Sequence, residues 1–274
     1  QDSPARRPTR APRAHKLLKP MPPPPGTWGR AARRRASMVW EHAIFAGMRD
    51  GFKSLEGSPK ELWMTFIAKF FASFSYFALS IVFTLFLTDE FEISDYKAGY
   101  IYGMWGTLAV LYGLLLGGVV DYLGVRTCVV FSFAVEAVAR VALAVTRSRN
   151  VMYLCVYLAL PVSGALGTPV KSIAVRRYTT AANRGFAFGL FYAVMNIAAL
   201  MTGAMLDTFR VGFKRGFEIE GVEDTPFFWV NNGVRLLLML TAVTSAIGLG
   251  FATRLKDIKV MDPAADGGEA GGAG

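Results

Sequence analysis

Six apolar runs of membrane-spanning length are the feature of this sequence that most constrains its fold. They occupy residues 62–87, 98–120, 127–145, 151–175, 186–206 and 233–253. An α-helix needs about 20 mainly apolar residues to cross the hydrocarbon core of a bilayer, and each run reaches about that length. The sequence therefore predicts an all-α membrane protein whose body, residues 62–255, is a bundle of six transmembrane helices.

Basic residues are concentrated ahead of the first run. Residues 1–61 hold 13 Lys or Arg and 5 Asp or Glu, so +8 of the formal net charge of +10 lies there. Segments on the cytoplasmic side of membrane proteins carry an excess of Lys and Arg. We therefore expect a multi-pass protein with both termini cytoplasmic, or on the equivalent inner side of an organelle. The partner expected for these charges is the lipid bilayer and not nucleic acid.

Three segments outside the bundle have compositions of their own. Residues 1–37 are rich in Pro, Arg and Ala and are predicted to be disordered, either as a polybasic cytoplasmic tail or as a transit-like segment. Residues 38–61 place an apolar residue at every fourth position from Trp40 to Phe52, which predicts an amphipathic helix. That helix either lies in the membrane interface or packs against the bundle. Residues 256–274 are expected to form a flexible Gly/Ala-rich cytoplasmic tail.

No pattern in the sequence is typical of an enzyme or of a cofactor site. No set of His, Cys and carboxylate residues has metal-ligand spacing, and there is no glycine-rich phosphate loop of the Walker type. The two cysteines, Cys128 and Cys155, lie inside apolar runs, where small buried side chains are expected. We therefore expect no catalytic residue, no metal and no cofactor.

The loop between the second and third runs carries a spaced motif. It has Gly117, three residues, Asp121, two residues, Gly124, one residue and Arg126. This resembles the signature loop of the major facilitator superfamily, although Tyr122 and Val125 replace basic residues that the family prefers. The resemblance implies the N-terminal six-helix half of a major-facilitator-type bundle. It also implies that these four residues form a gating motif that latches two halves together on the inner side.

Each anchor of this motif suggests a physical role. Gly117 would let another helix approach closely, and Gly124 would allow a tight turn. Asp121 would pair with Arg126 or with an arginine of the 176–185 loop, or would meet a helix N-terminus.

Three other segments are similar to proton-dependent oligopeptide transporters within that superfamily. They are the first helix over residues 69–89, the Gly-rich segment 164–171 and the aromatic segment 191–196. In place of that family's glutamate-rich motif in the first helix stand Met64 and Thr65. Proton coupling through those carboxylates is therefore not carried over.

Ionisable side chains at membrane depth are the main candidate site residues. A charge at the bilayer centre costs at least ~2.5–3.5 kcal/mol, so each charged residue in a span is expected to have a compensating partner or a function. Glu136 and Arg140 share a helix face and form either a polar patch in a water-filled cavity, with Glu136 as a proton carrier, or a self-neutralising ion pair. Lys171 is interpreted as an anion anchor. Lys69 either lines the pathway or extends to the inner interface, and Arg235 is expected to extend to the outer surface.

Uncharged residues complete the predicted solute and ion pathway. Tyr76, Tyr192 and Asn196 could line a cavity, while helix packing is the alternative for each. Glycines with three residues between them are expected to mark close helix contacts, at Gly99, Gly103, Gly113 and Gly117.

These features lead to two hypotheses. The first is secondary active transport of a small solute by alternating access around a midplane site, with proton coupling left open. Four basic side chains and one acidic side chain at membrane depth favour an anionic or zwitterionic solute. Rocking needs two halves, so this chain would supply the N-terminal half and need a C-terminal half or a second subunit. The alternative is a non-transporting structural or assembly subunit that retains half of the transporter fold.

Overall fold

A computed structural model of the chain describes residues 41, 45–212, 233–258 and 260. The chain divides into two units, residues 1–51 and 52–274, which are considered separately. In the first unit residues 45–51 are helical, and Phe45 and Met48 are exposed. The tail predicted over residues 1–37 lies outside the described residues, and the interfacial placement of the amphipathic helix stays a prediction.

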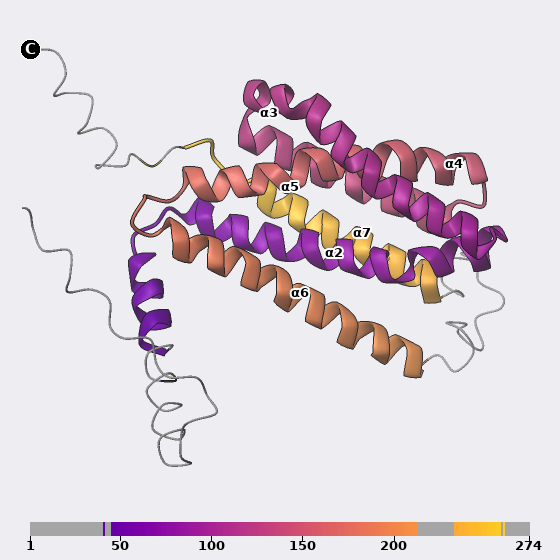
Figure 1. The fold of residues 1–274 in the computed structure, drawn as a ribbon, viewed down its shortest axis with the longest axis horizontal. Coiled ribbons are helices and arrows are strands. Elements are labelled where there is room, and N and C mark those ends of the chain that lie inside the picture. Colours follow the sequence, from indigo (N-terminus) through magenta and orange to yellow (C-terminus); the bar gives the residue numbers. More distant parts are fainter. Residues whose placement is uncertain (1–40, 42–44, 213–232, 259, 261–274) are drawn as a thin grey trace, which may run out of the picture. The chain divides into compact units, whose positions relative to one another are not determined.

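All regular structure in the described part of the second unit is helical (Figure 1). The helices are α2 (Lys60–Phe91), α3 (Asp95–Val145), α4 (Arg149–Leu154), α5 (Leu160–Arg177), α6 (Arg184–Gly212) and α7 (Gly233–Ala252). A π-helical turn, Cys155–Ala159, joins α4 to α5, so that Arg149–Arg177 is one helical stretch. Five stretches in the described residues are long and apolar enough to cross a membrane: α2, α3, the α4–α5 stretch, α6 and α7.

The longest helix, α3, contains two of the predicted spans. Its 51 residues would extend about 75 Å if straight, more than twice the ~30 Å of a hydrocarbon core. The helix is broken at Gly124, where φ is 79° and ψ is 168°, and the chain reverses direction there (Figure 1). The predicted runs 98–120 and 127–145 lie on either side of this break. The prediction of a six-span helical bundle is therefore confirmed, with five helical stretches carrying six spans.

Buried apolar side chains form two separate clusters, and buried polar side chains lie in the bundle between them. The outer-end cluster, named for its predicted side of the membrane, includes Phe83, Phe86, Leu143, Met152 and Leu237. The inner-end cluster includes Phe66, Phe133, Val170, Phe191 and Leu255. Helix α2 supplies both clusters from its two ends, and three of its buried polar side chains lie between them: Lys69, Ser73 and Ser75.

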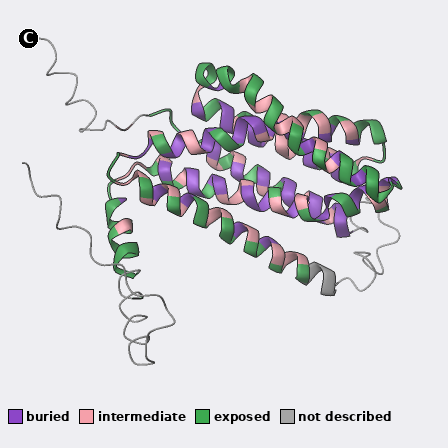
Figure 2. Cartoon of the chain, in the orientation of Figure 1, coloured by how far each residue is buried: buried purple, intermediate pink, exposed green. Residues whose placement is uncertain are grey.

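Helix α6 packs less extensively than the other spans. Only 17% of its most apolar window is buried, against 50% in each of the other four stretches. Its buried residues form one face: Ala187, Phe191, Ala198 and Thr202. Large side chains elsewhere on α6 are exposed (Figure 2), among them Tyr192, Ile197, Leu200 and Met201.

Close packing of α7 against α3 depends on Gly248. A Cβ atom at this position would overlap the ring of Phe133, which is fully buried. We expect Gly248→Ala to lower the free energy of unfolding by about 1–3 kcal/mol, because the ring has little room to move. Thermal unfolding in detergent checks this, with Gly250→Ala as the matched control, since nothing lies within 4 Å of a Cβ at Gly250. Equal stability of the two variants would contradict the prediction.

Candidate functional site

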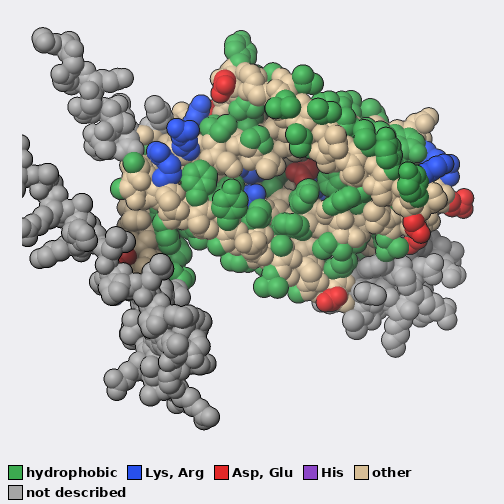
Figure 3. Space-filling model, in the orientation of Figure 1, with side chains coloured by type: hydrophobic (Ala, Val, Ile, Leu, Met, Phe, Trp, Pro, Cys, Tyr) green, Lys and Arg blue, Asp and Glu red, His purple; other side chains and the backbone are tan. Residues whose placement is uncertain are grey.

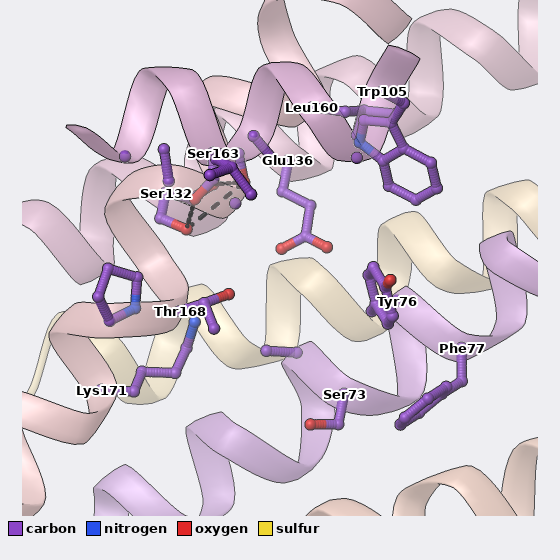
Figure 4. A pocket seen from close by; sticks show the side chains of 18 of the residues that line it. Ser73, Tyr76, Phe77, Trp105, Ser132, Glu136, Leu160, Ser163, Thr168 and Lys171 are labelled. Atoms are coloured by element: carbon purple, nitrogen blue, oxygen red, sulfur yellow. Dashed lines mark hydrogen bonds between the residues drawn. The ribbon is translucent and has the colours of Figure 1, made fainter. Parts of the chain in front are cut away.

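A cavity of about 560 Å³ lies in the polar middle of the bundle. Its wall comes from α2, from both arms of α3 and from α5, with Met195 contributed by α6. In Figure 3 acidic and basic atoms show at the bottom of a hollow near the middle of the visible face. The close-up in Figure 4 shows Glu136 pointing into this space from α3. Four charged side chains inside the bundle, Lys69, Glu136, Arg140 and Lys171, therefore line one cavity.

Glu136 and Arg140 form an ion pair along one face of α3. Arg140 Nη2 lies 2.6 Å from Glu136 Oε1, and Arg140 Nε donates to the same oxygen at 3.2 Å. The Arg140 side chain is 1% exposed and that of Glu136 is 12% exposed. The sequence left open whether this pair forms a polar patch in a cavity or an ion pair within the helix, and the structure has features of both. The charges neutralise each other within a helix, and both residues line the cavity.

Arg140 also connects the cavity to a hydroxyl network that the sequence analysis missed. Its Nη1 donates to the carbonyl oxygen of Ser75 on α2 at 2.8 Å. The hydroxyl of Ser75 contacts α7 at three points: it donates to the Thr241 carbonyl, it lies 2.6 Å from the Thr244 hydroxyl, and it accepts from Ser245. The signal in the sequence was the group of hydroxyl residues within the last apolar run, which charge-based reasoning does not single out.

Lys171 and Lys69 have no carboxylate partner in the described part of the chain. Lys171 is 4% exposed, its Nζ donates to the Gly167 carbonyl oxygen at 3.0 Å, and it lies 5.0 Å from the Phe133 ring centroid. Lys69 is 9% exposed, and its Nζ lies 4.8 Å from the Phe191 ring centroid. Both residues line the cavity. Among the described lining side chains, three are cationic and Glu136 is the one carboxylate.

Aromatic side chains form another part of the wall. Tyr76 and Tyr102 lie 5.7 Å and 5.8 Å from Trp105, measured between ring centroids, and Phe77 lies 5.4 Å from Tyr76. In Figure 4, Tyr76, Phe77 and Trp105 lie at the opposite side from Lys171, with Glu136 between them. The cavity therefore has a cationic end and an aromatic end.

Small and hydroxyl residues provide the space for this cavity. Ser132 and Ser163 each donate to the other's carbonyl oxygen, at 2.8 and 3.0 Å, and so hold α3 to α5. A Cβ at Gly167 would overlap the Ser132 hydroxyl, so these helices approach closely there.

The expected helix contacts at other glycines are not made by the described residues. Nothing lies within 4 Å of a Cβ built at Gly99, Gly103, Gly113 or Gly117. Gly103 and Gly113 instead line the cavity together with Gly106.

Two predicted pathway residues do not line the cavity. Tyr192 and Asn196 on α6 are exposed, whereas Met195 of the same helix contributes to the wall. The buried face of α6 contains Phe191 and Ala198, and with 100° of rotation per residue Tyr192 and Asn196 fall off that face. Sequence position alone could not show how α6 is rotated.

Arg235 is buried, and its expected extension to the outer surface is wrong. It is 2% exposed, and its guanidinium lies 2.6 Å from Glu90 Oε2. Its Nη1 donates to the carbonyl oxygens of Ala144 and Thr146 at 2.8 Å. The ends of α2 and α3 supply enough acceptors to hold this charge inside the bundle.

The signature loop turns at Gly124 and contacts the end of α7. The backbone N–H of Arg126 donates to Asp257 Oδ1 at 3.1 Å, and Arg126 Nη2 donates to the Thr253 carbonyl oxygen at 3.1 Å. Asp121 is exposed, and in the part of the chain that the structure describes it forms none of the expected ion pairs. Among the described residues the loop is thus held to the end of α7 through Arg126 and not through Asp121.

Comparison with known proteins identifies relatives of this arrangement. Residues 65–211, more than half of the chain, match the family model of the Major Facilitator Superfamily. Similar solved structures include a peptide transporter POT mutant in complex with sulfate, with 19% identity, a TM-score of 0.59 and 77% of this chain covered. They also include a POT family transporter in complex with 5-aminolevulinic acid, with 16% identity, a TM-score of 0.60 and 74% of this chain covered.

The chain spans less than half the length of these solved relatives. The match covers 43% of the first and 40% of the second. At such low identity the structural likeness shows the fold alone. A comparison with curated protein sequences finds no match.

Proposed function

Because the chain belongs to the major facilitator superfamily, a family of membrane transport proteins, we propose that its cavity binds a small anionic or zwitterionic solute during secondary active transport. The observation that carries this proposal is the pair of lysines at the cavity wall. Lys69 and Lys171 are buried beside the cavity and have no carboxylate partner among the described residues. The solute would supply the missing negative charge.

The positive charges of these lysines are less well compensated than the charge of Arg140. A charge at mid-membrane depth costs at least ~2.5–3.5 kcal/mol unless it is compensated. Arg140 is compensated by Glu136, whereas Lys171 has one carbonyl oxygen and an aromatic face. An aromatic face adds roughly 0.5–2 kcal/mol, less than a carboxylate at contact distance would add. The cationic end of the cavity is therefore the end that favours an anionic group.

The opposite end suits an apolar or ammonium group. Tyr76, Tyr102 and Trp105 present aromatic surface to the cavity, and Glu136 lies between them and Lys171. A zwitterion would place its carboxylate by the lysines and its ammonium by Glu136 and the rings. The ligands named for the similar structures, sulfate and 5-aminolevulinic acid, support an anion-bearing solute.

Glu136 is the candidate for proton coupling. It is the one carboxylate among the described residues that line the cavity, and the first helix lacks the glutamates of the oligopeptide transporters. Protonation of Glu136 would release Arg140 from its ion pair.

Alternating access would require a second body opposite this bundle. The chain carries six spans and covers 40–43% of its solved relatives, which supports the interpretation as an N-terminal half. The signature loop, with Gly117, Asp121, Gly124 and Arg126, would contact the second half on the inner side. Both termini would then lie on that side, as the distribution of basic residues indicates.

A steric plug in the cavity tests this function. Nothing lies within 4 Å of a Cβ at Gly106, which lines the cavity, so Gly106→Leu should fill the cavity without disturbing helix packing. A clash of about 1–3 kcal/mol would weaken solute binding about 5- to 150-fold. Uptake of anionic and cationic probes by proteoliposomes measures this, in the chain assembled with its second half.

Gly99→Leu is the matched control, because Gly99 lies on the same arm of α3, has nothing within 4 Å and does not line the cavity. Loss of anion uptake in Gly106→Leu alone would support the proposal. Equal uptake in both variants, or uptake of cations only, would overturn it.

The second candidate function is a structural or assembly subunit without transport activity. Recovery of a stable larger complex that takes up neither class of probe would support this alternative.

A further inference from the structure

The segment after α7 forms a strap across the inner end of the bundle. We define the α7 strap as residues 253–260, of which Lys259 lies outside the described residues. Leu255 is 1% exposed and packs in the inner-end cluster. The strap begins at the point where the sequence predicts the change from bundle to flexible tail. Its described residues contact the bundle instead of leaving it.

Hydrogen bonds join the strap to two different elements. On one side the Thr253 carbonyl and the Asp257 carboxylate accept from Arg126 of the signature loop, both at 3.1 Å. On the other side the Val260 N–H donates to the Arg177 carbonyl oxygen at 2.9 Å, and the Tyr178 hydroxyl donates to the Lys256 carbonyl oxygen at 2.8 Å. The strap thus bridges the signature loop and the end of α5.

Asp257 is the residue whose side chain fits the loop. Its Oδ1 accepts from the Arg126 N–H, and its Oδ2 lies 3.2 Å from where a Cβ of Gly124 would be. Gly124 has a φ of 79°, a region that favours glycine. The loop turn is therefore shaped both for its own backbone and for the approach of this carboxylate.

We propose that Asp257 is the positioning residue of the signature loop, and that the α7 strap couples this loop to α5 and to the chain that continues after Val260. With Arg126 held by the strap, Asp121 and Tyr122 face outward, and Tyr122 is 89% exposed. The part played in transport rests on the proposed function. The positioning of the loop does not, and it can be measured in the absence of solute.

The attachment to α5 does not depend on pH in the physiological range. Burial, with the nearby charges of Asp257 and Glu61, raises the pKa of Tyr178 to about 12. The hydroxyl therefore stays protonated and remains a donor to the Lys256 carbonyl oxygen. The Tyr178 contact therefore does not act as a titrating switch at working pH.

Amide hydrogen exchange at the loop tests the proposal directly. In the chain reconstituted in nanodiscs, Asp257→Ala should speed exchange of the peptide spanning residues 122–128 about 3- to 10-fold, as expected for loss of one hydrogen bond. A spin label on Tyr122→Cys should become more mobile in the same variant. Cys128 and Cys155 are buried and should not compete for the label.

Lys256→Ala is the matched control, because within the described residues the carbonyl oxygen of Lys256 has a hydrogen bond and its side chain has none. It should leave exchange and label mobility unchanged. Unchanged exchange in a folded Asp257→Ala variant, or equal acceleration in Lys256→Ala, would overturn the proposal. If Asp257→Ala does not fold, Asp257→Leu decides. It also removes the acceptor for the Arg126 N–H, so an exchange rate equal to that of the unmodified chain would overturn the proposal.

Discussion

Replacing Lys171 by methionine is expected to lower uptake of an anionic solute by at least about 30-fold. Removing one partner of a buried charge pair costs about 2–5 kcal/mol, and each 1.4 kcal/mol is a tenfold change in binding. Methionine fills a volume close to that of lysine but offers no charge. The free energy of unfolding should not fall, because Lys171 is 4% exposed and its ammonium has no carboxylate partner in the described residues. Uptake and stability should therefore change independently.

Two measurements on one preparation check this result. Uptake of a radiolabelled anionic probe by proteoliposomes, in the chain assembled with its second half, reports transport, and thermal unfolding in detergent reports stability. Lys60→Met is the matched control, because Lys60 is exposed at the start of α2 and does not line the cavity. Retained uptake in Lys171→Met would exclude this lysine as the anion anchor. A loss of uptake together with unfolding would show that Lys171 is needed for the fold.

Replacing Arg140 by methionine is expected to destabilise the bundle by about 3–5 kcal/mol. Breaking a buried ion pair leaves the remaining charge uncompensated, which costs more than the pair itself contributes. Glu136 would lose its partner at 2.6 Å, and the Ser75 carbonyl would lose a donor at 2.8 Å. The Glu136 side chain is 12% exposed toward the cavity, so screening by water there places the expected value at the low end of the range.

The double variant separates the charge effect from packing. Adding Glu136→Gln to Arg140→Met removes the unpaired carboxylate, so most of the lost stability should return. Reversible unfolding in mixed micelles measures the free energies of the four proteins of this double-mutant cycle. A double variant that is no more stable than Arg140→Met would show that shape, and not charge pairing, determines the stability of this site.

Several features of the fold were predictable because they depend on local chain properties. Each apolar run indicates a span because the bilayer thickness sets the required number of apolar residues. Gly124 was recognisable as a turn because its spacing from Asp121 and Arg126 matched a known loop, and the structure has a φ of 79° there. Glu136 and Lys171 stood out as candidate site residues because charges are costly inside apolar runs.

The surroundings of other residues could not be predicted from the sequence, because they depend on the rotation and packing of helices. Tyr192 and Asn196 are polar enough to attract attention, yet α6 turns them away from the cavity. Arg235 looked like an end residue, yet Glu90 and two carbonyl groups from α3 surround it. Ser75 did not stand out, because a serine in an apolar run is ordinary until a second helix places Arg140 against its carbonyl oxygen.

The contacts of the α7 strap at the edge of the bundle could not be predicted from the sequence either. Composition assigned Lys256 and Asp257 to a flexible tail, since their neighbours toward the C-terminus are small residues. The structure instead has the Lys256 carbonyl and the Asp257 carboxylate hydrogen-bonded to α5 and to the signature loop. Partners more than seventy positions away in sequence leave no local pattern.

The amino-acid sequence by itself determined that this protein spans a membrane six times, because hydrophobicity and run length are properties of consecutive residues. It also determined which side chains are costly to bury. Only the tertiary structure decided which buried charges are compensated within the chain. Arg140 pairs with Glu136 one turn away. Lys69 and Lys171 line the cavity, and neither lysine has a carboxylate partner among the described residues. That outcome depends on how four helical segments rotate against one another, and the free energy of packing sets those rotations.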